Sequence, residues 1–405
     1  MKILFVSDVS IHHVIGGAER VLYEQAVGLA RRGHEVAVLT RRLAEHDTAE
    51  ELIQNVQEWR YPIDNRNSLT FLHATLTGGT GLFERLQKAY AFELINGHQP
   101  FSAWAAQRSP LSRGMPFVYT CHSLAFEEYE TRHKKPENPI GRCLYALNIV
   151  LRRRIERRVL VRSKRIICLS EFSRQKLTTL HGIAPERIAI IPGGVDIDRF
   201  RPLADRMEAR RRLGLPESAP LLFTVRNLVP RMGLENLIAA MPAITAALPH
   251  ACLVIGGRGP LQESLAQQSR ALGMEGHIRF AGFIPEEDLP AYFGTADCFV
   301  LPTVALEGFG LVTVEALACG TPALGTPVGG TVEILRGLGP GHLFQGTSPE
   351  AIAELTVRRC LDWQTNPMGY EDLAQRCRRY AEDRYAWHRN VEETDRLLGR
   401  LVHDG

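Results

Sequence analysis

The chain has 405 residues, of which 45% are hydrophobic and 23% are charged, and its formal net charge is +3. One hydrophobic core rarely organises so long a chain, so we expect two domains of roughly 200 residues each. The composition is typical of a globular protein. The sequence has no stretch of ~20 uncharged apolar residues, so we expect no membrane-spanning helix.

The N-terminal segment predicts one βαβ unit. Residues 2–9 are apolar and rich in strand-forming residues, and they lack the long apolar core and cleavage site of a signal peptide. The segment GGAERVLYEQAVGLARRG then places apolar residues at helical spacing and ends at Gly33, after which HEVAVLT returns to strand. We expect a protein that stays in the cytoplasm.

Further strands are predicted at PFVYTCHS, RIICLS and IAIIPGGV, with helical segments between them. The first half is therefore predicted to form an open, mostly parallel sheet. Residues 1–200 carry 28 Lys and Arg against 21 Asp and Glu, which gives +7, and the excess is concentrated in residues 151–165. This basic segment is either a solvated helix face or a surface for anionic lipid headgroups or an acidic substrate. Aromatic residues do not alternate with the charges, which argues against binding of single-stranded nucleic acid.

Charged residues and prolines interrupt the pattern at about residues 200–220, where we expect a link between domains. Strand and helix alternate again from PLLFTVRNL to TPALGT, which predicts a second α/β sheet. The last segment, LAQRCRRYAEDRYAWHRNVEETDRLLGRLV, is predicted to be one long helix that packs back on the first domain. The predicted domains are residues 1–200 and 201–380, followed by a terminal helix over 381–405.

The eight cysteines form no CxxC pair, and several of them lie inside apolar runs such as RIICLS and ACLVI. We therefore expect reduced cysteines in the cores of an intracellular protein.

The segment EGFGLVTVEALACGTP, residues 307–322, contains two glutamates, Glu307 and Glu315, with seven residues between them. Residues 308–311 open a helix whose first N–H groups lack partners, and such an end can bind an anion. Glu307 either interacts with the helix dipole or accepts hydrogen bonds from sugar or ribose hydroxyls. Glu315 lies among apolar residues two turns further on, where an unpaired buried carboxylate would be costly.

Three other places carry candidate binding residues. Arg226 and Arg231 follow a predicted strand, where two guanidinium groups could hold a diphosphate or could simply be surface arginines. In the first domain, Gly16 and Gly17 open a helix after the first strand and would allow close approach of a ligand. His122 ends a predicted strand and is either a site residue or an ordinary structural histidine.

One metal motif is present in the sequence. Asp196 and Asp198 have the DxD spacing that holds a divalent cation in some nucleotide-sugar enzymes. They follow a glycine turn and lead into the proline-containing linker, so we expect a turn there and no bound metal. No His or Cys cluster has the spacing of a zinc site.

Together these segments resemble one known family. Nearly the whole chain is similar to the retaining nucleotide-sugar glycosyltransferases of family 4, the glycosyl transferases group 1, and residues 307–315 have the family's E-x7-E spacing. The resemblance implies the GT-B architecture, in which two Rossmann-like α/β domains face each other across a cleft and a C-terminal helix returns to the N-terminal domain. The N-terminal domain would bind the acceptor and the C-terminal domain the nucleotide sugar.

The resemblance also implies roles for the candidate residues. Glu307 would contact hydroxyls of the donor sugar and Glu315 the ribose of the nucleotide. Backbone amides of Phe309, Gly310 and Leu311 would meet the sugar and diphosphate. Arg226 and Arg231 would stabilise the diphosphate, although the family usually has an arginine and a lysine here, and an alignment on Pro230 would place Met232 at the lysine. Gly16 and Gly17 would close over the donor, and His122 would stand beside the transferred sugar.

The implied function is a hexosyltransferase that needs no metal or other cofactor. A UDP- or GDP-sugar would be the donor, and a saccharide or lipid-linked hydroxyl the acceptor, in glycan, polysaccharide or glycolipid synthesis. Residues 151–165 could contact the inner face of the membrane, and no nucleic acid is expected as a partner. The alternatives are a nucleotide-sugar epimerase of the same architecture and a non-catalytic subunit of a glycosylation complex.

Overall fold

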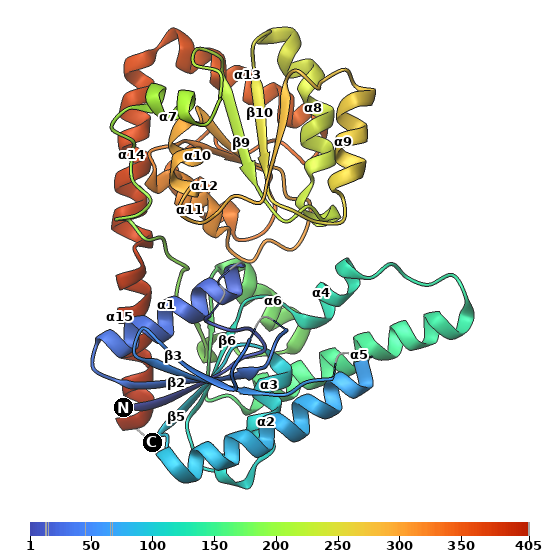
Figure 1. Cartoon of the computed structure of the whole chain (residues 1–405), viewed down its shortest axis with the longest axis vertical. Coiled ribbons are helices and arrows are strands. Elements are labelled where there is room, and N and C mark those ends of the chain that lie inside the picture. Colours follow the sequence, from blue (N-terminus) through green and yellow to red (C-terminus); the bar gives the residue numbers. More distant parts are fainter. Residues whose placement is uncertain (13, 15, 45, 65, 67, 404–405) are drawn as a thin grey trace. The chain divides into compact units, whose positions relative to one another are not determined.

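A computed structural model describes residues 1–12, 14, 16–44, 46–64, 66 and 68–403 of the chain. It divides into two compact units: unit 1 comprises residues 1–193 and 388–405, and unit 2 comprises residues 194–387 (Figure 1). The sequence had placed these boundaries at 200/201 and 380/381, so each observed boundary lies seven residues away. The segment 200–220, interpreted above as a linker, belongs to unit 2.

Unit 1 is built on an eight-stranded sheet in the order β3-β4-β2-β1-β5-β6-β7-β8. All neighbouring strands run parallel except β3 and β4, which form an antiparallel pair at one edge. The strands are β1 (Lys2–Val6), β2 (Glu35–Arg41), β3 (Glu50–Ile53), β4 (Val56–Tyr61), β5 (Leu94–Gly97), β6 (Phe117–Cys121), β7 (Arg165–Cys168) and β8 (Ile188–Ile190). The helices are α1 (Gly17–Arg31), α2 (Ser68–Tyr90), α3 (Pro100–Arg108), α4 (Ala125–Arg132), α5 (Pro139–Arg162), α6 (Glu171–His181) and α15 (Trp387–His403).

The central strands β1 and β6 of unit 1 are buried on both faces, as expected for a parallel sheet covered by helices, whereas the edge strand β3 is largely exposed. One core lies between the sheet and α2, α3 and α5, and it includes Phe83, Tyr119 and Leu160. The other core lies on the opposite face, where Leu22 of α1 and Leu398 of α15 pack near Phe5 of β1. The C-terminal helix is therefore part of the core of unit 1.

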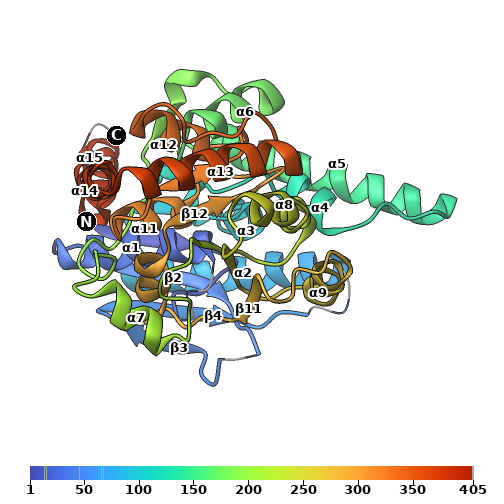
Figure 2. The same ribbon diagram turned by 90° about the horizontal axis from the view of Figure 1, so that it is seen from above.

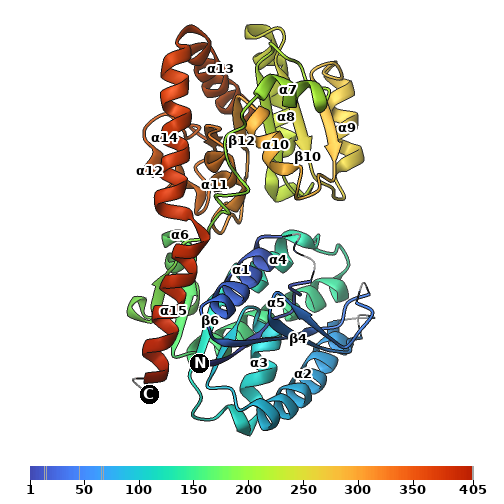
Figure 3. The same ribbon diagram turned by 60° about the vertical axis from the view of Figure 1, so that its left-hand side comes forward.

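Unit 2 contains a five-stranded, fully parallel sheet in the order β11-β10-β9-β12-β13. Helices α8 and α13 pack side by side over one face of the sheet (Figure 2), and α11 lies against α14 on the other side (Figure 3). The strands are β9 (Leu221–Val225), β10 (Cys252–Gly256), β11 (Ile278–Gly282), β12 (Cys298–Leu301) and β13 (Ala323–Gly325). The helices are α7 (Arg206–Arg212), α8 (Leu234–Ala247), α9 (Gln262–Ala271), α10 (Leu289–Thr295), α11 (Leu311–Ala318), α12 (Thr331–Leu338), α13 (Pro349–Thr365) and α14 (Pro367–Tyr385).

The predicted single C-terminal helix is wrong, because the chain breaks at Ala386 into α14 and α15. Ala386 is extended, with φ −66° and ψ 135°, and forms a parallel bridge with Val195. The amide of Val195 donates to the carbonyl of Tyr385 at 2.6 Å, and the amide of Trp387 donates to the carbonyl of Val195 at 3.2 Å. These bonds replace helical ones, so apolar periodicity alone did not reveal the interruption.

All eight cysteines are free thiols, and seven of them are buried, as the sequence predicted; Cys143 is exposed.

The packing of α15 on α1 can be tested at Gly28. A Cβ atom at Gly28 would lie 2.4 Å from Cγ2 of Val391, whereas one at Gly81 in α2 would meet nothing within 4 Å. We expect Gly28→Ala to lower the free energy of unfolding by about 1–3 kcal/mol because the helices must separate. Gly81→Ala, the matched control, should be neutral or raise it by up to ~1 kcal/mol. Urea denaturation measures both, and equal effects would contradict the close packing.

Candidate active site

The carboxyl ends of β9 and β12 bring two predicted site residues of unit 2 into direct contact. Arg226 follows β9 and Glu307 lies in the loop after β12, and these two strands are neighbours in the sheet. The guanidinium Nη2 of Arg226 donates to Oε2 of Glu307. The side chains are only 6% and 11% exposed, so this ion pair is nearly withdrawn from water. The sequence had placed both residues in the site but had not predicted that they pair.

Met232 and Thr303 complete the surroundings of Arg226. Nη2 of Arg226 lies 2.8 Å from the sulfur of Met232 and 3.4 Å from Oγ1 of Thr303. Met232 is buried and packs in the core cluster of unit 2. If Met232 is aligned with the family's lysine, an uncharged core residue stands at the lysine position. The second cation of this loop is then Arg231.

Arg231 supports the loop that carries Glu307. Its Nη1 donates to the carbonyl of Leu306 at 2.8 Å, and its own carbonyl accepts from the amides of Val304 and Ala305 at 3.0 and 3.3 Å. Leu306 has a positive φ of 53°, an uncommon conformation for a residue with a side chain. Arg231 thus holds residues 304–306 against the turn that follows β9.

The start of α11 has the geometry of a helix end built around glycine. Gly310 is the N-cap, with φ 98° and ψ 59°, and no side chain caps the first N–H groups of the helix. A Cβ atom on Gly310 would lie 2.1 Å from Oγ1 of Thr331, so a larger residue would displace the loop. Thr331 instead donates to the carbonyl of Phe309 at 3.0 Å. The backbone amides at residues 309–311 thus sit at a positively polarised helix end next to the Arg226–Glu307 pair.

The side chain of Phe309 has a structural role. It is buried and packs edge-to-face against Tyr385, with the ring centroids 5.7 Å apart. Phe309 therefore anchors the loop through its ring and leaves its backbone for contacts with a ligand.

Glu315 is half-buried on α11, while its neighbours Val314 and Ala316 are fully buried. It faces Cys319 one turn later, and burial together with the Glu315 carboxylate raises the pKa of that thiol. The sequence had suggested an energetically costly carboxylate on a buried helix face. The structure avoids most of that cost, because Glu315 lies at the boundary of the apolar face of α11.

In unit 1, Gly16 and Gly17 begin α1. Gly16 is its N-cap in an extended conformation, and a Cβ atom there would lie 2.5 Å from Oε2 of Glu19. Burial raises the pKa of Glu19. The start of α1 thus lies close to the carboxyl group of Glu19, and the close approach of a ligand to Gly16 and Gly17 stays a prediction.

His122 follows β6 and pairs with a residue that the sequence analysis missed. Nε2 of His122 lies 3.0 Å from Nδ1 of His98, which follows the neighbouring strand β5. Burial lowers the pKa of His122 to about 4 and also lowers that of His98, so both rings are neutral at pH 7. The sequence shows His98 only as the last residue of LINGH, and the neighbouring position of its strand to the one before His122 comes from the sheet order.

Asp196 has the turn role that the sequence predicted. Its Oδ1 accepts from the amides of Asp198 and Arg199, each at 3.1 Å. No group of three or more potential metal ligands from His, Cys, Asp and Glu occurs among the described residues.

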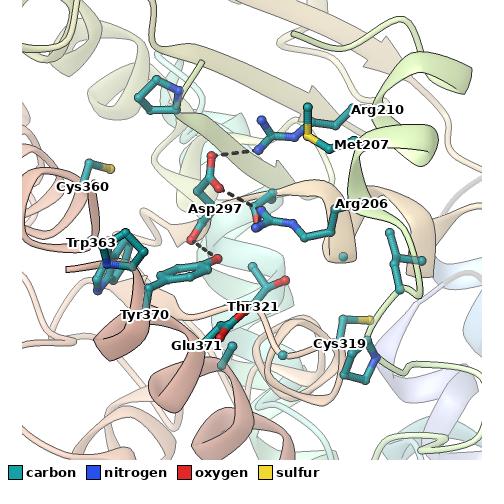
Figure 4. A pocket seen from close by; sticks show the side chains of 18 of the residues that line it. Arg206, Met207, Arg210, Asp297, Cys319, Thr321, Cys360, Trp363, Tyr370 and Glu371 are labelled. Carbon is teal, nitrogen blue, oxygen red and sulfur yellow. Dashed lines mark hydrogen bonds and ion pairs between the residues drawn. The ribbon is translucent and has the colours of Figure 1, made fainter. Parts of the chain in front are cut away.

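A cavity of about 850 Å³ lies at the other end of the unit 2 sheet (Figure 4). Asp297, which precedes β12, binds Arg206 and Arg210 of α7 at 2.8 Å each and accepts from the amide of Leu221 at 2.8 Å. Tyr370 donates to the carbonyl of Asp297 at 3.2 Å. These bonds attach the segment 200–220 to unit 2, and within the described part of the chain the cavity includes no predicted site residue.

The buried histidine pair predicts a pH dependence of stability. His122 has a pKa of about 4 in the folded state and an ordinary value of 6.5, so between these values the unfolded state binds more protons and stability falls as the pH falls. We expect the free energy of unfolding to drop by up to ~3 kcal/mol from this residue between pH 6.5 and 4. Chemical denaturation of the wild type and His122→Gln at several pH values measures the difference. An identical pH slope in both proteins would contradict a neutral buried His122.

Comparisons with known proteins identify the family of the chain. The family model "Glycosyltransferase Family 4" matches residues 15–199, and "Glycosyl transferases group 1" matches residues 205–384. The chain is 26% identical to D-inositol 3-phosphate glycosyltransferase of Kineococcus radiotolerans, over 96% of this chain and 91% of that protein. It is 32% identical to GDP-mannose-dependent alpha-(1-6)-phosphatidylinositol monomannoside mannosyltransferase of Mycolicibacterium smegmatis, over 57% of this chain and 61% of that protein.

Solved structures show the same fold. Sucrose-phosphate synthase from Thermosynechococcus elongatus superposes with a TM-score of 0.82 at 22% identity and covers both chains fully. Anabaena Alr3699/HepE in complex with UDP and glucose superposes with a TM-score of 0.76 at 20% identity, over 98% of this chain and 99% of that one. Since the two family models together cover both α/β units, the chain belongs to the family 4, group 1 glycosyltransferases and is a nucleotide-sugar-dependent hexosyltransferase of the GT-B fold.

Proposed function

We propose that the protein transfers a hexosyl unit from a UDP- or GDP-sugar to a hydroxyl acceptor with retention of the anomeric configuration. The observation that supports this most is the buried Arg226–Glu307 pair beside the uncapped start of α11. It places a cation, a carboxylate and unpaired backbone amides at one sheet end, where a diphosphate and a sugar could bind together.

In this proposal, negative charge that develops on the departing diphosphate is stabilised by Arg226, Arg231 and the amides of residues 309–311. Glu307 accepts hydrogen bonds from hydroxyls of the donor sugar, and Glu315 binds the ribose. Because these side-chain cations and backbone amides would stabilise the charge of the departing diphosphate, the proposal includes no metal ion.

The acceptor is proposed to attack from the face that the diphosphate leaves. The C1–O bond to the diphosphate breaks while the acceptor oxygen forms a bond to the same carbon, and the acceptor proton passes to a departing phosphate oxygen. This order retains the anomeric configuration without a covalent intermediate on the protein.

The donor site is tested by replacing its cations. We expect Arg226→Ala and Arg231→Ala each to lower turnover by ~10²–10³, because each removes a donor aimed at the developing charge. Arg270→Ala, an exposed arginine at the end of α9, is the control and should keep the wild-type rate. Proton NMR of the product in excess EDTA measures rate, anomeric configuration and metal independence together.

A folding check separates catalysis from stability in this experiment. Arg226→Ala leaves a nearly buried Glu307 carboxylate without its cation, and such a loss typically lowers the free energy of unfolding by about 3–5 kcal/mol. Turnover is therefore compared on protein shown to be folded by circular dichroism, and the double variant Arg226→Ala/Glu307→Gln removes the unpaired charge. Wild-type rates in both arginine variants would contradict the proposed diphosphate site.

A membrane-surface acceptor is proposed on different grounds from those in the sequence. Several arginines of residues 151–165 are engaged by unit 1 itself, since Arg153 donates to the carbonyl of Leu180 and Arg157 to that of His181. The exposed apolar side chains lie earlier in α5, on one face at i, i+4, i+7 and i+10. They are Ile140, Leu144, Leu147 and Val150, which are 76%, 56%, 61% and 44% exposed.

None of the helices among the described residues has the length and apolar character needed to cross a bilayer. A helix face with exposed apolar residues and nearby cations is instead suited to lie on an anionic lipid surface. The proposed contact is therefore the first half of α5, with the exposed arginines of its second half as the attracting charges.

Vesicle co-sedimentation tests this contact. Wild-type protein should sediment with vesicles that contain phosphatidylglycerol and less with vesicles of phosphatidylcholine alone, because anionic lipid attracts the cations. Leu144→Ser/Leu147→Ser should lower the bound fraction severalfold, whereas Leu52→Ser, at a 66% exposed leucine of β3, should not. Equal binding of both variants would contradict α5 as the contact.

A further inference from the structure

A second group of charged side chains lies in unit 1 at the carboxyl ends of its strands. Asp8 follows β1 and Arg41 is the last residue of β2. Arg152 comes from the middle of α5, which packs against α3, and α3 packs against α2 (Figure 3). Burial raises the pKa of Asp8, while hydrogen bonds from Ser102 of α3 and the charges of Arg41 and Arg152 act in the opposite direction.

Aromatic rings hold the two arginines of this group. The guanidinium carbon of Arg152 lies 4.6 Å from the ring centroid of Tyr129 and 5.1 Å from that of Phe101. The guanidinium carbon of Arg41 lies 5.5 Å from the ring of Phe71, which packs edge-to-face on Phe101. Stacking on a ring fixes a guanidinium but leaves its N–H edge available for hydrogen bonds.

Polar atoms of the group are buried without partners. Nε of Arg41, Nε of Arg152 and Oδ1 of Asp8 are each buried and form no hydrogen bond within the described part of the chain. Asp8 is only 8% exposed, and its backbone is fixed because its amide donates to Gln99 at 2.9 Å. Leaving several such atoms unpaired is costly unless a ligand completes them.

Another buried ion pair of the same sheet shows that the fold can satisfy such groups. Glu58 of β4 accepts from Oγ of Ser10 at 2.7 Å, the amide of Ile11 at 2.8 Å and Nε of Arg60 at 2.6 Å. Both carboxylate oxygens of Glu58 are therefore used. The group around Asp8 differs from this pair because some of its buried polar atoms have no hydrogen-bond partner among the described residues. Such atoms are expected at a binding site, where a ligand supplies the partners.

The charges favour an anionic ligand. Arg41 and Arg152 both act electrostatically on the single carboxyl group of Asp8, and two cations against one carboxyl group leave an excess of positive charge. Glu128 also acts on Arg152, but it is engaged by Ser123 and by Arg132, the latter at 3.6 Å. Two stacked guanidiniums can bind a phosphate or carboxylate group, and Asp8 can accept a hydrogen bond from a hydroxyl.

We propose that Asp8, Arg41 and Arg152 bind a negatively charged substituent and a neighbouring hydroxyl of the acceptor. The acceptor is then a polyhydroxylated molecule that carries a phosphate or a carboxylate group. The inference rests on the proposed function only in identifying this ligand as the acceptor.

Isothermal titration calorimetry without donor tests the site directly. Glucose 6-phosphate, glucuronic acid and glucose serve as probes, and the first two distinguish a phosphate from a carboxylate ligand. We expect at least one anionic probe to bind the wild type roughly tenfold or more tightly than glucose, and Arg41→Gln and Arg152→Gln each to remove most of that preference. Arg154→Gln, at an exposed arginine two residues along α5, should bind as the wild type does.

The outcomes separate this inference from the proposed function. UDP and GDP binding is measured on the same proteins, with folding confirmed by thermal denaturation and Arg152→Lys as a charge-preserving variant. Wild-type protein that binds UDP or GDP but shows no preference for either anionic probe overturns the acceptor site alone. Protein that binds an anionic probe through Arg41 and Arg152 but binds neither nucleotide overturns the donor assignment and leaves this site supported. Equal losses in Arg152→Gln and Arg154→Gln would also overturn the inference, since the effect would then reflect overall charge.

Discussion

The ion pair between Arg226 and Glu307 is the interaction on which the loops at the carboxyl end of the unit 2 sheet depend. A buried guanidinium is stable only with a partner, so the strand end at β9 and the loop after β12 hold each other in place. Arg231 and Thr331 then fix the remaining residues of the loop through its backbone. A ligand that entered would compete for groups that already satisfy one another, which keeps the cation and the carboxylate oriented before binding.

Parallel sheets explain why candidate residues gather in each unit. All carboxyl ends of parallel strands meet at one edge, and the loops there are free to carry polar side chains while the strands are buried. In unit 1 this edge holds the His98–His122 pair and the group around Asp8. In unit 2 it holds Arg226, Glu307 and the start of α11. The opposite edge of unit 2 has a cavity, but there Asp297 is occupied by the arginines of α7.

The sequence predicted the parts of the molecule that local patterns control. Helix α1, the central strands and the glycine-framed start of α11 follow from periodicity and turn residues. The strand β4, the break at Ala386 and the inclusion of residues 200–220 in unit 2 did not, because each depends on a partner distant in the sequence. These partners are β2 for β4, Val195 for the break, and Asp297 for α7. For the site, residue types were predictable, but His98 as a partner of His122 and Glu307 as a partner of Arg226 required knowledge of which strands are neighbours.

The break at Ala386 also has a consequence for how the chain folds during synthesis. Unit 2 is one continuous stretch, so its residues are made without interruption by another unit. Unit 1 instead needs α15, which supplies Val391, Leu398 and the bond from Gln25 to Asn390, and these residues are made only after the whole of unit 2. The part of the chain that is translated first is therefore the part that must wait longest for its own core to close.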